Sequence, residues 1–382
     1  MAKIETIEVV PTTLPDLLGE PMHLCLVRVT AEGVVGWGEI CDSYCCTFPE
    51  VYVPLVERVY APLVIGSELV AVDVPTRKLR TWARRRIGDA GLAIQALSGL
   101  ELALWDLHGK LAGRSVAQLI GQTRDRIPVY ASGKFLDEPL DMHVQILAPA
   151  LEHGVRTTKV RTSLDPAADA VALRRLRAEL PAELAVMVDG NENYSLPTAR
   201  RLAAELADQG VIAFEEPVPQ VFRRAIARLV EQAPLPIAYG EHLFGAAEFG
   251  DALAAGWPNI VQPDPSIAGG LSECLQIAAV AEGYGVPVMP HAAAGPLAMA
   301  ACLHLAAARQ NVALVEHAFT LEPLWEVLVG PQLSSSAIVD GFLAVPSGPG
   351  LGLELDEQAL RAHPYQPKSY DMSMPRRSIG VI

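Results

Sequence analysis

The feature that most constrains the fold of this chain is a repeated alternation of short apolar, β-branched segments with helix-like segments. Eight such apolar segments occur, at residues 127–132, 155–161, 185–189, 211–215, 235–241, 259–264, 286–291 and 312–316. Short β-branched runs are typical of buried strands, and strands that alternate with helices form parallel sheets. Eight repeats predict an α/β fold of the (β/α)₈ TIM-barrel type. A doubly wound sheet is disfavoured because residues 132–134 lack a Gly-rich first turn.

Two further regions flank this predicted barrel. Three β-rich runs occupy residues 4–10, 24–30 and 34–40. Leucines spaced three and four apart then predict a helix that contains Leu97 and ends near Gly113. We expect an α+β capping domain at residues 1–125 and the catalytic barrel at 126–330. The Pro/Gly-rich C-terminal segment, 331–382, is expected to pack back on the capping domain.

The composition excludes several classes of protein. Hydrophobic residues make up 51% of the chain and charged residues 19%, which permits a large buried core and argues against disorder. The net charge of −14 argues against a protein that binds nucleic acid or an anionic membrane surface. Six cysteines without a CxxC pair indicate reduced thiols. Since no signal peptide or membrane span is evident, we expect a cytoplasmic protein without nucleic-acid or membrane partners.

Each predicted strand from the second onward ends in an ionisable residue. The series is Arg161 (with Lys159 two residues earlier), Asp189, Glu215, Glu241, Asp264, His291 and Glu316. Consecutive members from Arg161 onward lie 23 to 28 residues apart, one for each strand–helix unit. Because a barrel forms its active site at the carboxyl ends of its strands, we expect these side chains to meet at one mouth.

Three of these residues predict a metal site. Asp189, Glu215 and Glu241 end three neighbouring strands, so their carboxylates would repel one another and lose hydration when buried together. A divalent cation compensates for this directly, and an all-oxygen ligand set favours Mg²⁺, with Mn²⁺ as the second choice. The alternative is a structural salt-bridge cluster with Lys159 and Arg161.

The remaining strand-end residues predict proton-transfer chemistry. Asp264 lies on the strand beside His291, where a carboxylate fixes the imidazole tautomer and raises its basicity. Lys159 and Arg161 point the same way on one strand. A lysine beside a cation can have a lowered pKa and act as a base or bind a carboxylate, whereas an arginine only donates. Glu316 could donate to a developing oxyanion if protonated, or could form a salt bridge at the rim.

Three polar residues next to the predicted ligands have weaker assignments. Asn191 lies two residues after Asp189, so it should share its side and support the metal site or contact the substrate. His242 follows Glu241 and could be a further acid or a substrate contact, but strand alternation also allows it to point away. Glu216 is expected to turn away from the site and to be structural.

These residues lie within a series of short motifs in a characteristic order. The series is Gly36-Trp37-Gly38-Glu39, the segment 102–110, Lys159-Val160-Arg161, Val188-Asp189-Gly190-Asn191, Glu215-Glu216-Pro217, Gly240-Glu241, Gln262-Pro263-Asp264, Gly269-Gly270, Pro290-His291 and Pro349-Gly350-Leu351-Gly352. Each motif is short and unspecific alone. In this order and spacing, the chain resembles the enolase superfamily, and within it the mandelate racemase subgroup, over essentially its whole length.

The resemblance implies roles position by position. It implies Mg²⁺ ligands at Asp189, Glu215 and Glu241, a proton-abstracting dyad at Asp264 and His291, and a substrate-carboxylate contact at Glu316. Lys159 and Arg161 match a Lys-x-Lys pair, from which the chain departs because its second member is arginine.

The resemblance also implies how the rest of the chain contributes. The capping domain would cover the barrel mouth with loops near residues 16–22 and 42–48, and Tyr44 in the second loop is a candidate substrate contact. A homo-oligomer is expected.

The implied reaction begins with removal of the proton α to a carboxylate, with His291 as the base and an enediolate as the intermediate. Arg161 is a poor base, which argues against a racemase that needs a base on each face. We therefore favour dehydration of an acid sugar, an aldonate or aldarate, to a 2-keto-3-deoxy acid. A racemase, epimerase or lactone cycloisomerase of the same superfamily is the alternative, and a non-catalytic metabolite-binding barrel is a remote one.

Overall fold

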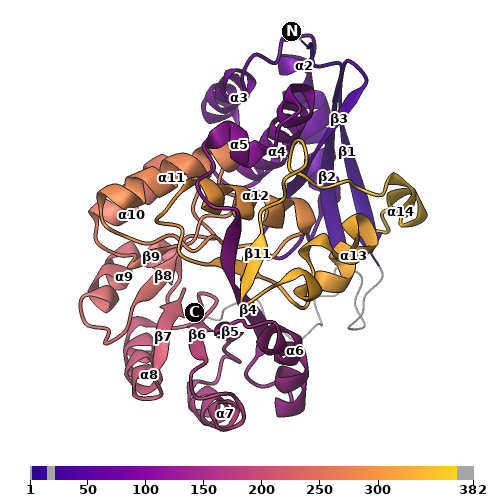
Figure 1. Cartoon of the computed structure of the whole chain (residues 1–382). Helices are drawn as coiled ribbons and strands as arrows, with labels where there is room; N and C mark the ends of the chain where they lie inside the picture. The colour runs from indigo at the N-terminus through magenta and orange to yellow at the C-terminus, as the bar shows by residue number, and fades with distance from the viewer. Residues whose placement is uncertain (1, 15–21, 368–382) are drawn as a thin grey trace.

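The computed structural model describes residues 2–14 and 22–367, which form a capping domain and a parallel barrel (Figure 1). The predicted fold class is confirmed. Most of the first predicted lid loop, residues 16–21, and the end of the C-terminal segment, 368–382, lie outside the described residues. Within the described part of the chain, no helix has the length and apolar character needed to cross a membrane.

The capping domain is built on an antiparallel sheet with the strand order β1-β2-β3, formed by β1 (Thr6–Leu14), β2 (Met22–Ala31) and β3 (Val34–Ile40). Its helical segments are α1 (Pro49–Pro54), the π-helical η1 (Leu55–Tyr60), α2 (Ala61–Val64), α3 (Asp73–Arg86), α4 (Leu92–Ala112) and α5 (Val116–Ile120). The helix predicted from the leucine spacing is α4, which ends at a left-handed Gly113 with φ +62°.

Two glycines of the first motif allow α4 to lie directly on the sheet. A Cβ atom added at Gly36 would come 2.3 Å from the carbonyl oxygen of Ala103, and one at Gly38 would come 2.1 Å from that of Gly99. Both distances are far inside van der Waals contact, so only glycine permits this approach of strand and helix.

The barrel strands run in the order β10-β4-β5-β6-β7-β8-β9. They are β4 (Arg126–Phe135), β5 (Thr157–Arg161), β6 (Ala185–Asp189), β7 (Val211–Glu215), β8 (Ile237–Tyr239), β9 (Ile260–Val261) and β10 (Val315–His317). The strand predicted at 286–291 is reduced to one bridging position, Val288, which pairs with Val261 and Val312 and so links β9 toward β10. The later strands are shorter than predicted because some of the apolar residues in each predicted run lie in loops and do not pair with a neighbouring strand.

Helices surround these strands (Figure 1). They are α6 (Leu140–Glu152), α7 (Pro166–Glu179), α8 (Leu196–Asp208), the 3₁₀ turn η2 (Gln220–Phe222), α9 (Arg223–Val230), α10 (Gly245–Ala254), α11 (Leu271–Gly283), α12 (Pro296–Ala308) and α13 (Glu322–Val329). Asp165 caps α7 by accepting from the amides of Ala167 and Ala168, and Ser195 caps α8 by accepting from Thr198.

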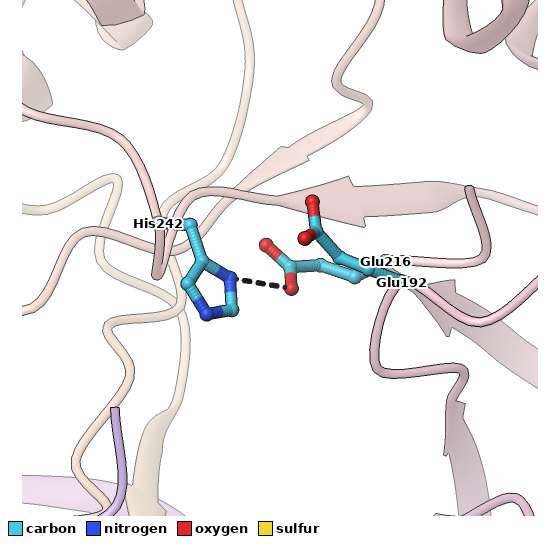
Figure 2. Close-up of side chains that lie close together, drawn as sticks. All are labelled: Glu192, Glu216 and His242. Atoms are coloured by element: carbon cyan, nitrogen blue, oxygen red, sulfur yellow. Dashed lines mark hydrogen bonds and ion pairs between the residues drawn. The ribbon is translucent and has the colours of Figure 1, made fainter. Parts of the chain in front are cut away.

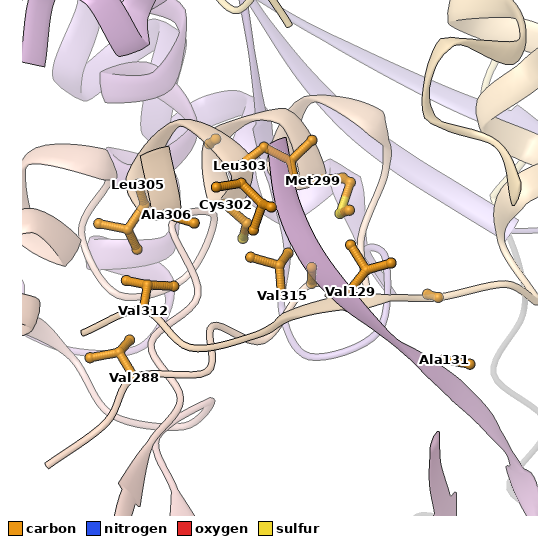
Figure 3. Packing of buried hydrophobic residues seen from close by; sticks show 14 of the residues in the cluster. Val129, Ala131, Val288, Met299, Cys302, Leu303, Leu305, Ala306, Val312 and Val315 are labelled. Atoms are coloured by element: carbon orange, nitrogen blue, oxygen red, sulfur yellow. The ribbon is translucent and has the colours of Figure 1, made fainter. Parts of the chain in front are cut away.

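The Ala-rich helix α12 lies between the barrel and the capping domain. All thirteen of its residues are buried, as is expected for a helix that is apolar on every side. Figure 3 shows its side chains, including Met299 and Leu303, packed over Val129 of β4 and Val315 of β10. This segment is therefore a central packing element of the whole chain.

The C-terminal segment joins both domains. After the 3₁₀ turns η3 (Gly330–Leu333) and η4 (Ser335–Ala337), β11 (Phe342–Ala344) pairs antiparallel with β4 at the amino end of the barrel. The chain then returns to the capping domain, where Pro364, just after α14 (Glu357–Ala362), bridges to Thr12 of β1. The segment thus contacts the first sheet at Thr12, and the barrel strand β11 was not predicted.

Two buried carboxylates of the capping domain bind the amino ends of barrel helices. Glu39 of β3 accepts from the backbone amides of Gly295 and Ala298 at the start of α12. Glu101 of α4 accepts from the amides of Leu271, at 2.8 Å, and Ser272, at 3.0 Å, at the start of α11. Helix amino ends carry unpaired amides and a partial positive charge, so these carboxylates connect the two domains.

We predict that Glu39→Gln and Glu101→Gln each lower the free energy of unfolding by about 1–3 kcal/mol, because the new NH₂ group faces a buried amide donor. Urea unfolding followed by circular dichroism measures the change. Glu183→Gln, at an exposed position, is the control and should be neutral. Equal stability of all three variants would contradict the role assigned to the two buried carboxylates.

Candidate active site

Neighbouring strands place the ionisable residues side by side at the barrel mouth. In the strand register Arg161 of β5 pairs with Asp189 of β6, which in turn pairs with Glu215 of β7. Glu241 follows β8, and Glu316 lies within β10. The backbone register of the short parallel strands therefore determines the order of the charged residues around the mouth.

Asp189, Glu215 and Glu241 form a buried group of carboxylates. One oxygen from each lies within 4.8 Å of the others, and at most 5% of any of these residues is exposed. Burial raises the pKa of Asp189 and of Glu215, although the charge of Lys159 opposes it. This group could hold a metal ion.

Lys159 lies at the centre of this charge cluster. Its Nζ is 2.5 Å from Oε1 of Glu215, 3.1 Å from Oε1 of Glu316 and 3.9 Å from Oδ2 of Asp189. Burial lowers the pKa of Lys159, but the carboxylates of Glu215 and Glu316 outweigh this and raise it well above its usual value. Without a bound cation Lys159 is therefore a charged donor, and the lowered pKa expected beside a cation stays a prediction.

Arg161 borders the same cluster from the next inward position of β5. Its Nη1 donates to the carbonyl oxygen of Gly133 at 2.8 Å, and its Nε lies 3.5 Å from Oδ2 of Asp189. Burial lowers the pKa of Arg161, but Asp189, Glu316 and Tyr44 are among the groups that raise it. Tyr44, in the loop at residues 42–48, is 43% exposed, and it lies near enough to Arg161 to be among the groups that raise the arginine pKa.

Asp264 and His291 form a direct hydrogen-bonded pair. Nδ1 of His291 lies 2.7 Å from Oδ2 of Asp264, and Nε2 lies 3.4 Å from Oε2 of Glu241. Oδ1 of Asp264 accepts from the amide and the hydroxyl of Ser266, so both of its oxygens are engaged. Burial lowers the pKa of His291, but Glu241 and Asp264 raise it to about 10.

Glu316 is an ionised acceptor in this structure. Its Oε2 accepts from the amide of Ala292 at 3.2 Å, and its Oε1 faces Lys159. Burial raises the pKa of Glu316, but Lys159, His291 and Arg161 together hold it well below its usual value. These neighbours favour the ionised form of Glu316, and donation from a protonated Glu316 to a developing oxyanion stays a prediction.

Asn191 supports Asp189 directly. Its backbone amide donates to Oδ1 at 2.8 Å, and its side-chain amide donates to Oδ2 at 3.2 Å. Asn191 has a positive φ of 43°, a conformation that Asn tolerates better than most residues. The structure thus places it beside the carboxylate group, as the strand spacing indicated.

His242 lies closer to Glu216 than to any of the three carboxylates, of which Glu241 has Oε1 3.9 Å from the histidine Nδ1. Its Nδ1 lies 2.9 Å from Oε2 of Glu216, and Figure 2 shows the Glu192 carboxylate beside that of Glu216. Glu216 raises the pKa of His242 well above its usual value. His242 thus belongs to a second cluster behind the first, which also contains the outward-turned Glu216, and its suggested role as an acid or substrate contact stays a prediction.

Sequence reasoning missed Gln262 as a part of the site. Its Nε2 donates to Oε2 of Glu215 at 2.5 Å, and the residue is only 1% exposed. Gln262 lies two residues before Asp264, so strand alternation places both on one face. That spacing was the signal that could have identified it.

Comparison with known proteins relates both domains to described families. Residues 18–121 match the family "Mandelate racemase / muconate lactonizing enzyme, N-terminal domain". Residues 142–359 match "Enolase C-terminal domain-like". The two matches together span most of the capping domain and of the barrel.

Individual relatives cover nearly the whole chain. D-galactarolactone cycloisomerase of Agrobacterium fabrum is 31% identical over 88% of this chain and 90% of its own length. D-galactonate dehydratase of Xanthomonas axonopodis pv. citri is 30% identical over 97% of this chain and 98% of its own length. The crystal structure of the 3,6-anhydro-D-galactonate cycloisomerase of Zobellia galactanivorans has a TM-score of 0.85 and 26% identity, covering 95% of this chain and 100% of that one.

We predict that His291 remains protonated at pH 8 in metal-free protein, because its pKa is raised to about 10. Because the folded pKa lies above the ordinary histidine pKa of about 6.5, the protonated imidazole adds to the free energy of unfolding. This contribution is complete below about pH 6.5 and is lost as the pH rises through about 10. Histidine ¹⁵N NMR in EDTA measures its titration. Asp264→Asn should lower the midpoint toward 6.5; a neutral His291 at pH 8 in the unmodified protein would refute the assignment.

Proposed function

Because this chain belongs to the mandelate racemase / muconate lactonizing enzyme family of the enolase superfamily, we propose that it removes the proton α to the carboxylate of an acid sugar. The observation that carries the proposal is the His291–Asp264 pair, whose second imidazole nitrogen, Nε2, faces Glu241 of the carboxylate group. An imidazole oriented by a carboxylate is suited to proton abstraction.

The chain's residues fit a hard divalent cation, Mg²⁺ or Mn²⁺, at Asp189, Glu215 and Glu241. All three ligands are oxygens, all are buried, and their like charges lie within 4.8 Å of one another. When bound, the cation would stabilise the negative charge that develops on the substrate carboxylate. Gln262 and Asn191 hold two of the three carboxylates in place by donating to Glu215 and Asp189.

Lys159 and Arg161 bind and orient the substrate in this proposal. Lys159 is charged and buried, so it can donate to a carboxylate oxygen and attract the charge that forms there. Arg161 keeps its proton, so it donates to a substrate hydroxyl or carboxylate and does not act as a base. His291 is then the sole base among these residues, which favours elimination over racemisation.

Dehydration needs one base that becomes an acid. His291 must be neutral to act as a base, and a cation held at Glu241 would favour that form by offsetting the charge that raises the histidine pKa. His291 then takes the α proton, and the electron pair of the broken C–H bond moves toward the substrate carboxylate to give an enediolate. That pair forms a C=C bond as the β-hydroxyl leaves. The imidazolium returns the proton to that hydroxyl, which departs as water. The resulting enol converts to a 2-keto-3-deoxy acid.

A cycloisomerase is the second candidate. It is favoured by the similarity to the galactarolactone and anhydro-galactonate cycloisomerases. The same proton removal would expel a ring oxygen instead of a hydroxyl, so the active site would need no further residue. A homo-oligomer, a cytoplasmic location and the absence of nucleic-acid and membrane partners stay predictions.

We predict that a panel of aldonates and aldarates with Mg²⁺ will include one that the protein converts to a 2-keto product. His291→Asn should lower kcat roughly 10²–10⁴-fold because the base is lost. His108→Asn, on the partly exposed side of α4, is the matched control and should retain activity. Ring opening of lactones or anhydro acids without dehydration would favour the cycloisomerase, and full activity of His291→Asn would exclude the proposed base.

We also predict that Asp189→Asn abolishes tight Mg²⁺ binding and that Gln262→Leu weakens it about 10–100-fold, because Glu215 loses its donor. Isothermal titration calorimetry measures both affinities. Gln358→Leu, at an exposed position of α14, should bind Mg²⁺ normally. Unchanged affinity in Asp189→Asn would remove the metal site from the proposal.

A further inference from the structure

A second cluster of potential ligands lies behind the proposed Mg²⁺ site. Glu192, Glu216 and His242 each offer one ligand atom, and these atoms lie within 4.8 Å of one another. Figure 2 shows both carboxylates extending toward the His242 ring. Glu216 and His242 directly follow two of the proposed Mg²⁺ ligands in sequence, so the same strand ends present ligands on two opposite sides.

The second cluster has more negative than positive charge. Among the described residues, no lysine or arginine forms an ion pair with Glu192 or Glu216, and the single basic partner is His242. Oε1 of Glu241 adds a further negative charge 3.9 Å from the His242 ring. One imidazole thus faces three carboxylates, a balance that is costly where one of them is fully buried.

The cluster also contains buried oxygens without a donor. Glu216 is 0% exposed, and its Oε1 has no hydrogen-bond partner within the described part of the chain. Gln220 donates through its backbone amide to Glu192 and through Nε2 to the carbonyl of His242, but its own Oε1 is also buried and unpaired. A carboxylate has only acceptor atoms, so no reorientation of Glu216 removes the deficit.

A cavity borders the cluster at Glu192. A cavity of about 630 Å³ lies between the loops that follow β5, β6 and β7, and Glu192 forms part of its wall together with Asn193, Tyr194 and Phe222. Glu192 is the one member of the cluster on this wall, and the His242 side chain is itself 32% exposed, so the cluster is not closed off from solvent.

We propose that Glu192, Glu216 and His242 form a second divalent-cation site. Two carboxylates and an imidazole favour Mn²⁺ or Zn²⁺, whereas the all-oxygen group at Asp189 favours Mg²⁺. The two sites therefore differ in metal preference. The second ion supplies the positive charge that the cluster lacks and becomes the partner of Glu216 Oε1.

The test counts Mn²⁺ and Zn²⁺ bound to the full-length protein by equilibrium dialysis in the presence of excess Mg²⁺, which occupies the first site. We expect one ion per chain to be retained. Glu192→Gln and His242→Asn should each weaken its binding at least about tenfold, and Asp189→Asn should leave it in place. Circular dichroism verifies that each variant is folded, and anomalous scattering at the Mn or Zn edge locates the ion in crystals.

The outcomes separate the two sites. Absence of retained Mn²⁺ and Zn²⁺ in the unmodified protein, or retention unchanged by both Glu192→Gln and His242→Asn, would overturn the proposal. Loss of the ion in Asp189→Asn alone would assign it to the first site. The test measures bound metal and not activity. A failed activity screen would therefore count against the proposed reaction without affecting the second cation site.

Discussion

The structure depends on how it compensates a surplus of buried negative charge at the barrel mouth. Four carboxylates, at Asp189, Glu215, Glu241 and Glu316, face the same space as Lys159, Arg161 and His291. Removing such groups from water is costly unless opposite charges and hydrogen bonds replace the lost hydration. Lys159 contacts three of the four carboxylates, so it is the main internal cation. The proposed metal ion would compensate the remaining negative charge, and only with that ion bound would the site attract an anionic substrate.

Much of this arrangement could be predicted because a barrel converts sequence spacing into position. Residues such as Asp189 and Glu215 end their strands, and the parallel register then sets them side by side. The protonation states could not be predicted, because they depend on distances between side chains: three positive groups near Glu316 keep it ionised, and two carboxylates keep Lys159 charged. The direction of His242 was open for a related reason. It lies just beyond the end of a short strand, where the alternation of side chains no longer decides the outcome.

For the fold as well, elements that depend on nearby residues were predicted, and contacts between residues far apart in the sequence were not. The leucine spacing identified α4, and the alternating apolar runs identified most barrel strands, since both signals are local. β11 has only three residues, and its pairing with β4 depends on a segment more than 200 positions away. Glu39 and Glu101 also required the structure, because the amides that they bind belong to helices far along the chain. Their acidic character inside apolar surroundings was the only local indication.

The position of the C-terminal segment has a consequence for biosynthesis. β11 contributes the last strand beside β4, and Pro364 closes against Thr12 near the start of the chain. A nascent polypeptide therefore cannot complete either domain until almost all of it has left the ribosome, although both the antiparallel sheet and the first helices exist much earlier. Premature termination would leave the edges of both layers open, with apolar surface exposed to other chains.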